Sequence, residues 1–340
     1  MMDFAITDYS PDCASNISDA LSKIKEMIYT EEGRNYLNTV FKIQPPLNVS
    51  ASDSFELDAS HFLAYIFRSF QGVVQYSFDA LNNYTMNGYG IDGLCEIMTT
   101  KEESVSKIAK FYFLFKAVTY LDNDYNRDIS HISKNTYNLS NPYDFNGNSA
   151  DRGWVWICCG MAMGLLQSAE SSHTIFNRML PLQYYFQLCQ DVFGPTINTT
   201  YITKKVEETI YHFGNPWNYS ASNVVLVNGG YDPWSALGSK VTRKDQHQIA
   251  IQIPKAAHCS DMYPARNGEP IALKAAREAI ENELDYFIKN AAVPTTLMPS
   301  TPTTSSLVVT TSDSSTPMKS NVATSFLLCV ILFLFGKFFV

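Results

Sequence analysis

The sequence predicts an α/β fold in which a long helical stretch precedes a short sheet-forming segment. Two runs rich in β-branched residues, 223–228 and 247–253, are each followed by loop residues, and residues 269–288 then have the pattern of a helix. Strand, loop, strand, loop, helix is the order expected at the C-terminal side of an α/β sheet. Before residue 215 the apolar residues recur mainly with a helical period.

The helical stretch, residues 14–215, has apolar side chains at the spacing of amphipathic helices that bury one face. Two such faces are Ile17, Leu21, Ile24 and Ile28, and Ile108, Phe111, Tyr112 and Phe115. The chain has 340 residues, 46% of them hydrophobic, which is more than one minimal core needs. We therefore expect one large domain with an insertion, or two domains.

The two ends of the chain differ from this folded part. Residues 1–9 lack the basic and apolar segments of a signal peptide, and we expect a piece to be missing upstream. Residues 291–324 are rich in Ser, Thr and Pro and predict an extended stalk. The apolar tail, 325–340, is shorter than the roughly 20 residues that cross a bilayer, and its layout fits a GPI-attachment signal. A short single-pass anchor with Lys337 at the cytosolic face is the alternative, and both predict a membrane-anchored protein.

The charge pattern argues against nucleic acid as a partner. The formal net charge is −8, and acidic and basic residues are interspersed without a Lys/Arg stripe that could follow phosphates. The seven cysteines include no C-x-x-C pair and have no histidine at ligand spacing, so no metal is expected. Residues 229–230 (GG) lack the rest of a phosphate-binding motif, and no cofactor is expected.

Six N-x-S/T tripeptides indicate passage through the secretory pathway, where oxidised cysteines would also be stable. The candidate glycosylation residues are Asn16, Asn48, Asn83, Asn138, Asn198 and Asn218. We expect the extracellular face of the plasma membrane, or a lysosome or vacuole, as the destination.

Polar residues follow both predicted strands. Asp232 lies in residues 228–234 (NGGYDPW), and His258 lies in residues 254–261 (PKAAHCSD). Because loops beyond the carboxyl ends of parallel strands converge, the two side chains are expected to meet there. An aspartate that orients a histidine, which in turn deprotonates a serine, is the logic of a catalytic triad. Taken alone, Asp232 would be interpreted as a residue that initiates a turn through its carboxylate; the two motifs must be taken together to indicate a catalytic pair.

These strings resemble the end of the lysosomal Pro-X carboxypeptidase family, which includes the dipeptidyl peptidase II and thymus-specific serine protease branches. The resemblance rests on 228–235 (NGGYDPWS) and 253–261 (IPKAAHCSD), with further similar blocks at 9–13 (YSPDC) and 152–159 (RGWVWICC). It covers residues 1–290, and it is weakest in the helical middle.

The resemblance implies an α/β-hydrolase core with a large inserted helical domain that caps the active site. Residues 1–12 would be the remnant of the first core segment, 13–215 the cap, and 216–290 the return to the core with Asp232 as acid and His258 as base. The implied activity is that of a serine-type exopeptidase, a carboxypeptidase or dipeptidyl peptidase that cleaves beside proline. The family suggests a Cys13–Cys95 disulfide, and Cys159–Cys189 is a plausible second; Cys158 and Cys259 would be thiols or bonded to each other.

Two departures from the family bear on activity. The chain contains no G-x-S-x-G, so the serine nucleophile is absent and the chain by itself is expected to be inactive. After Cys159 it has Gly160-Met161-Ala162 where the family has Thr-Glu, so substrate preference cannot be carried over.

The expected partners are peptide or protein substrates and, through the tail, a membrane; a homodimer is left open. The alternative function is a non-catalytic cell-surface binding or decoy protein that keeps a hydrolase scaffold without its serine.

Overall fold

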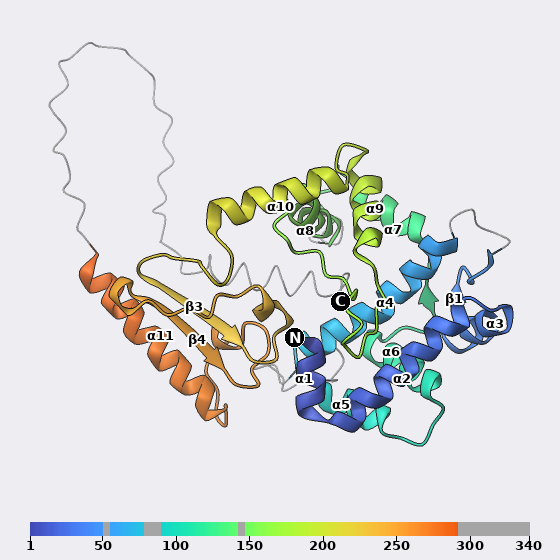
Figure 1. Cartoon of the computed structure of the whole chain (residues 1–340), viewed down its shortest axis with the longest axis horizontal. Helices are drawn as coiled ribbons and strands as arrows, with labels where there is room; N and C mark the ends of the chain where they lie inside the picture. The colour runs from blue at the N-terminus through green and yellow to red at the C-terminus, as the bar shows by residue number, and fades with distance from the viewer. Residues whose placement is uncertain (50–54, 78–89, 142–146, 292–340) are drawn as a thin grey trace, which may run out of the picture.

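The computed structural model describes residues 1–49, 55–77, 90–141 and 147–291 (Figure 1). Its first part, here called the helical region, runs from α1 to α10. The helices are α1 (Met2–Tyr9), α2 (Pro11–Ile28), α3 (Glu31–Val40), α4 (Phe55–Gln75), α5 (Ile91–Met98), α6 (Ser104–Lys116), α7 (Tyr125–Ser133), α8 (Ser149–Cys159), α9 (Leu182–Phe193) and α10 (Thr199–Phe213). Two short strands, β1 (Ile43–Gln44) and β2 (Leu121–Asp122), pair in parallel among them.

Local sequence explains why α2 forms where it does. Ser10 caps its N-terminus by accepting from the Cys13 amide, and Pro11 occupies the first turn, where no amide donor is needed. The predicted apolar face of α2 is buried throughout, since Ile17, Leu21, Ile24 and Ile28 are at most 1% exposed. The face predicted around residues 108–115 is likewise buried in α6. Both periodicity predictions are confirmed.

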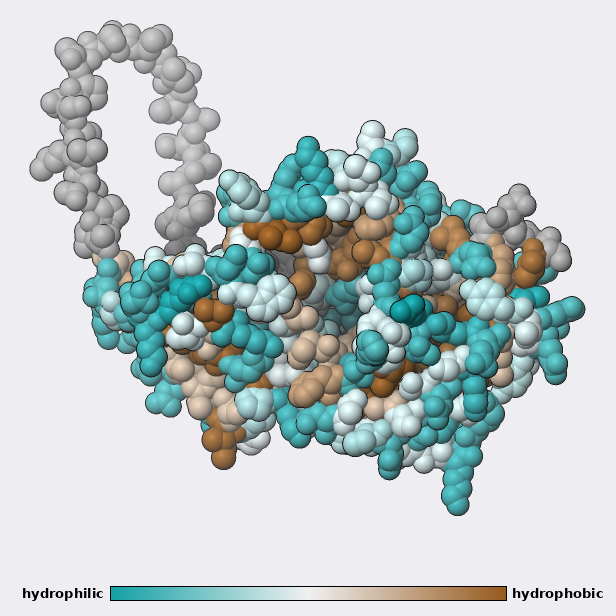
Figure 2. Space-filling model, in the orientation of Figure 1, coloured by the Kyte–Doolittle hydropathy of each residue, from teal (hydrophilic) through white to brown (hydrophobic). Residues whose placement is uncertain are grey.

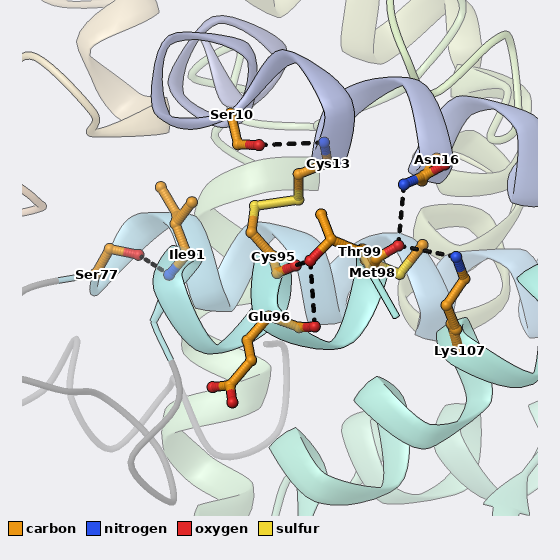
Figure 3. The surroundings of a disulfide bond; sticks show 10 residues. All are labelled: Ser10, Cys13, Asn16, Ser77, Ile91, Cys95, Glu96, Met98, Thr99 and Lys107. Atoms are coloured by element: carbon orange, nitrogen blue, oxygen red, sulfur yellow. Dashed lines mark hydrogen bonds between the residues drawn. A yellow bond between two sulfur atoms is a disulfide. The ribbon is translucent and has the colours of Figure 1, made fainter. Parts of the chain in front are cut away.

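Two disulfides tie the helical region together. Cys13 in α2 is bonded to Cys95 in α5, and Cys159 at the end of α8 is bonded to Cys189 in α9. Figure 3 shows the first of them between the two helices, with the Asn16 amide donating to the Met98 carbonyl one turn away. These are the two pairs named from the family resemblance and the sequence. Cys158 and Cys259 are not disulfide-bonded, so the alternative of a bond between them is wrong.

The C-terminal segment contains the remaining elements, β3 (Val224–Gly229), β4 (Gln248–Ile253) and α11 (Ile271–Asn290), with short 3₁₀ turns η4 (Pro233–Ala236), η5 (Lys244–Gln246) and η6 (Ser260–Met262). β3 and β4 pair in parallel in a register that places Val224 opposite Gln248 and Gly229 opposite Ile253. Helix α11 packs on this sheet through Leu273 and Ala276. The predicted order of strand, loop, strand, loop, helix is confirmed, and α11 starts two residues later than predicted, with Pro270 at its N-cap position.

The helical region and the C-terminal segment contact each other beside the carboxyl ends of β3 and β4. The Tyr231 side chain is buried in the core of the helical region, and its hydroxyl donates to Asp8 Oδ2 of α1 over 2.6 Å. Helix α4 contacts η4. Figure 2 shows a recess between α10 and the C-terminal segment, with hydrophobic side chains gathered along its wall beneath α10.

Within the described part of the chain, no helix has the length and apolarity of a membrane span. The predicted stalk from residue 292 onward and the tail 325–340 lie outside the described residues, as does the candidate glycosylation residue Asn83. The boundary at residues 12–13 and the cap role of residues 13–215 stay predictions. Helix α1 packs on α2 and α4 and shares the core of the helical region.

Candidate active site

Asp232 lies three residues beyond the end of β3 and uses its two carboxylate oxygens differently. Oδ1 accepts from the Trp234 amide over 2.9 Å and thereby caps η4, which is the turn role considered from the sequence. Oδ2 lies 2.8 Å from His258 Nδ1. Asp232 is 8% exposed, so this carboxylate is buried and hydrogen-bonded at both oxygens. The turn role and the pairing with histidine therefore coexist.

His258 follows β4 and lies at the same sheet edge as Asp232. Because a carboxylate can only accept, Nδ1 of His258 carries the proton in this hydrogen bond, and Nε2 of a neutral ring is left as an acceptor. Nε2 is buried and has no hydrogen-bond partner among the described residues. As the acceptor nitrogen of a neutral imidazole, Nε2 is available to a donor such as a water or a hydroxyl group. A serine hydroxyl is such a donor.

Two glycines let the acid-bearing and base-bearing loops approach each other. A Cβ on Gly229 would lie 2.6 Å from the Ala256 carbonyl oxygen, and one on Gly230 would lie 2.8 Å from the Lys255 amide nitrogen. Both contacts are with backbone, which cannot move aside without displacing the loop that leads to His258. The glycines of residues 228–234 (NGGYDPW) thus serve close packing of the two loops.

The helical region holds these loops through α4 and α8. Gln75, the last residue of α4, accepts from the His258 amide with its backbone carbonyl over 2.8 Å. Its side-chain Oε1 accepts from the Trp234 indole over 3.1 Å. The Trp154 ring of α8 packs edge-on against Trp234 with centroids 5.6 Å apart. The rings of Tyr76 and His258 lie 6.3 Å apart.

Asp261, three residues after His258, is a second carboxyl group near the pair. Arg277 of α11 donates to the backbone carbonyls of Asp261 and Ser260 over 2.6 and 3.0 Å, which fixes the turn after His258. Burial raises the pKa of the Asp261 carboxyl, and the charges of Arg277 and His258 partly oppose that rise. Asp232, by contrast, is hydrogen-bonded directly to the imidazole.

Comparison with known proteins decides the family. A family model described as serine carboxypeptidase S28 matches residues 1–280. The chain belongs to the serine carboxypeptidase S28 family.

Relatives of the chain carry serine-protease or prolyl-carboxypeptidase-like names. A Caenorhabditis elegans protein named as serine protease F56F10.1 is 33% identical over 296 residues, which are 84% of this chain and 53% of the relative. Prolyl carboxy peptidase like protein 5 of the same organism is 23% identical over 302 residues, 85% of this chain and 57% of the relative. The thymus-specific serine protease of Mus musculus is 29% identical over 152 residues, 45% of this chain and 29% of the relative.

Membership of the S28 family confirms the resemblance inferred from the sequence, and with it a serine-peptidase relationship. The chain spans about half the length of the Caenorhabditis elegans relatives that it matches over most of its own length. Two disulfides, together with this family, indicate a secretory or lysosomal protein.

The two cysteines outside the disulfides have different surroundings. Burial raises the pKa of the Cys158 thiol to about 12, so it stays protonated and unreactive. Cys259 follows His258 with φ of 56°, in the left-handed region that non-glycine residues seldom adopt. This backbone bend turns the chain from His258 into η6.

The described glycosylation candidates differ in accessibility. Asn16 lies within α2, and the amide nitrogen that would carry a glycan donates to the Met98 carbonyl over 3.1 Å. Asn48, Asn138, Asn198 and Asn218 are exposed. Asn198 caps α10 through its side-chain oxygen. Among the described residues there is no group of three or more metal-ligating side chains.

Sequence reasoning missed the roles of Gln75 and Trp154. Trp154 lies in the block 152–159 (RGWVWICC) that carried part of the resemblance, so its block was noticed but not its contact. Nothing in the sequence around Gln75 distinguishes it from other residues of an amphipathic helix.

Proposed function

We propose that this chain supplies the acid and the base of a serine-type exopeptidase, with Asp232 as acid and His258 as base. The observation that supports this most directly is the state of the imidazole. Its Nδ1 is hydrogen-bonded to a buried carboxylate, while its buried Nε2 has no partner among the described residues. A triad histidine needs this arrangement before its serine is in place.

In the proposed reaction, the serine oxygen attacks the carbonyl carbon of the scissile peptide bond while His258 Nε2 takes the serine proton. Asp232 holds the imidazole in the tautomer with a basic Nε2 and stabilises the imidazolium that forms. His258 then gives the proton to the leaving amine nitrogen, and the C–N bond breaks. The chain has no G-x-S-x-G, so the proposed nucleophile comes from polypeptide outside it, and the chain by itself is expected to be inactive.

We extend the proposal to cleavage near peptide ends, beside proline, with the helical region as the cap. The contacts of α4 and α8 with the loops that bear Asp232 and His258 support a role for these helices beside the site. The apolar wall of the recess in Figure 2 suits peptide side chains. The Ser/Thr/Pro-rich tract and apolar tail support anchorage of the protein at a membrane surface.

The proposal is tested by supplying a serine. The part of the Caenorhabditis elegans relative F56F10.1 that lies outside the matched region would be fused to this chain, and the fusion treated with a fluorophosphonate probe. We expect labelling of one serine in the fusion and none in the chain by itself. His258→Ala and Asp232→Asn should each lower kcat by about 10⁴-fold with KM little changed.

Proline-containing peptides blocked at either end then separate the two exopeptidase types. A carboxypeptidase loses activity when the C-terminus is amidated, and a dipeptidyl peptidase loses it when the N-terminus is acetylated. The comparison requires a parent fusion that reacts with the probe and variants that fold. If His258→Ala or Asp232→Asn then kept more than about a tenth of the parent kcat, the activation barrier would have risen by less than ~1.4 kcal/mol, and the assignment of that residue to the triad would fail. Asp261 would then be tested as the acid.

A further inference from the structure

Gln75 belongs to helix α4 and is hydrogen-bonded both to the loop of the proposed acid and to the loop of the proposed base. It is the last residue of α4 and is 4% exposed. The last carbonyls of a helix have no partner within the helix, so the Gln75 carbonyl can accept from the His258 amide. Its side-chain amide reaches the Trp234 indole instead.

The orientation of the Gln75 amide follows from its partner. An indole N–H can donate but cannot accept, so the oxygen of the amide faces Trp234. A side chain without an acceptor would leave the indole N–H without this hydrogen bond. Gln75 is therefore suited to this position by chemistry as well as by size.

Four hydrogen bonds join Gln75, Trp234, Asp232 and His258 into a closed ring. The Trp234 indole donates to Gln75, the Trp234 amide donates to Asp232 Oδ1, and Asp232 Oδ2 accepts from His258 Nδ1. The His258 amide closes the ring by donating to the Gln75 carbonyl. The loop that bears Asp232 and the loop that bears His258 are thus both hydrogen-bonded to one residue of the helical region.

We propose that Gln75 is a positioning residue that sets the geometry of the Asp232–His258 pair through Trp234. This inference rests on the proposed function, because the pair has to be catalytic for its geometry to matter. The Gln75 side chain would act on the acid loop, and its carbonyl on the base loop. Small misplacements of catalytic groups cost much rate, so a residue that fixes both loops affects turnover while touching no substrate.

Proton NMR of the chain as it stands tests this without a serine. The Nδ1 proton of a histidine bonded to a buried carboxylate gives a low-field signal, and His258→Gln identifies it by its disappearance. In Gln75→Met, which keeps size and helix propensity but removes the acceptor, we expect this proton to exchange with water at least about tenfold faster. Trp234→Phe removes the same hydrogen bond from the other side and should have the same effect.

The double variant and two controls make the outcome specific. In the double variant Gln75→Met/Trp234→Phe, the His258 Nδ1 proton should exchange no faster than in either single variant, because all three variants lack the same hydrogen bond between the indole and the amide. Gln71→Met alters a buried glutamine one turn earlier in α4, for which the structure gives no hydrogen bond to either loop, and should leave exchange unchanged. Gln75→Glu also keeps an acceptor but buries a carboxyl group near the pair, so the signal should be retained at a pH where that carboxyl is protonated.

The results separate this inference from the proposed function. If Asp232→Asn left the His258 signal unchanged, the acid–base pair and the proposed function would both fail. If Asp232→Asn removed the signal while Gln75→Met and Trp234→Phe exchanged within about twofold of the parent, only the role of Gln75 would be refuted. Circular dichroism confirms that each variant is folded, and Trp234→Phe decides the matter if Gln75→Met does not fold.

Discussion

The helical region and the C-terminal segment bury apolar side chains to very different extents. The core of the helical region runs continuously from α1 to α10 and is crossed by both disulfides. The separate core of the C-terminal segment has only Ile253, Leu273 and Ala276 as buried members among the described residues. All of Val224 to Val227 in β3 are only half-buried, although strands of parallel sheets are normally covered on both faces.

The proposed acid and base therefore lie on the less buried of the two parts. Their loops are held by Gln75, Trp154 and Asp8 of the helical region as well as by their own strands. We infer that the helical region contributes most of the stability of this chain, and that these few contacts restrict the motion of the loops that bear Asp232 and His258. Variants in the helical region, in the C-terminal segment or at the contact between them should therefore differ in their effect on stability.

The largest effect on stability is expected from the Cys13–Cys95 disulfide. Its removal in Cys13→Ala/Cys95→Ala frees a loop closed over 82 residues, which should lower the free energy of unfolding by about 4 kcal/mol. The Cys159–Cys189 bond closes 30 residues, and its removal should cost somewhat less. Denaturant unfolding measures both. Equal or reversed costs would mean that the disulfides do not act mainly on the unfolded chain.

Acid should destabilise the helical region through His61. Burial lowers the pKa of His61 from 6.5 to about 3, and Tyr184 lies 2.8 Å from its Nδ1. Between these two pH values the unfolded chain binds the proton more tightly than the folded one, so stability is lost as pH falls. We expect a loss of about 3 kcal/mol between pH 7 and pH 4 that His61→Gln lacks, seen in unfolding curves at several pH values. His173→Gln, at an exposed position, is the control and should keep the parent slope.

A smaller effect is expected where the two parts meet. Tyr231→Phe removes the hydrogen bond to Asp8, whose carboxylate is partly in water, and should cost about 1 kcal/mol. Hydrogen exchange should accelerate in β3 and β4 and stay constant in α2, because only the C-terminal segment depends on this contact. Tyr211→Phe changes a tyrosine that is 94% exposed and serves as the control. Acceleration spread evenly over both parts would contradict the division between them.

The sequence predicted those features that local pattern determines. The faces of α2 and α6 follow from helical spacing, and the meeting of Asp232 with His258 follows from the rule that loops after parallel strands converge. The pairing of β1 with β2 was not predicted, because two residues are too few to show a period. Asn16 has the acceptor tripeptide, yet only the fold places it within a helix with its amide nitrogen in use.

Gln75 marks the limit of such reasoning in the site. Its two bonds cross 159 and 183 positions of sequence to Trp234 and His258, and no local signal records such a contact. The same holds for Trp154 against Trp234. Asp232 and His258, the proposed acid and base, lie at recognisable strand ends, whereas the contacts of Gln75 and Trp154 depend on packing between distant elements.

The smallest effect is expected on the outer face of α11. Ile288 is 75% exposed, so Ile288→Ser moves little apolar surface between protein and water and should change the free energy of unfolding by less than about 0.5 kcal/mol. Ile24 in α2 is fully buried, and the same replacement there should cost several times more, since it leaves a cavity and buries a hydroxyl. Denaturant unfolding of the two variants compares the parts directly. A cost above ~1.5 kcal/mol at Ile288 would mean that this face is covered in solution. Sedimentation at two protein concentrations would then show whether a second copy of the chain covers it, since dimer dissociation depends on concentration and packing within one chain does not.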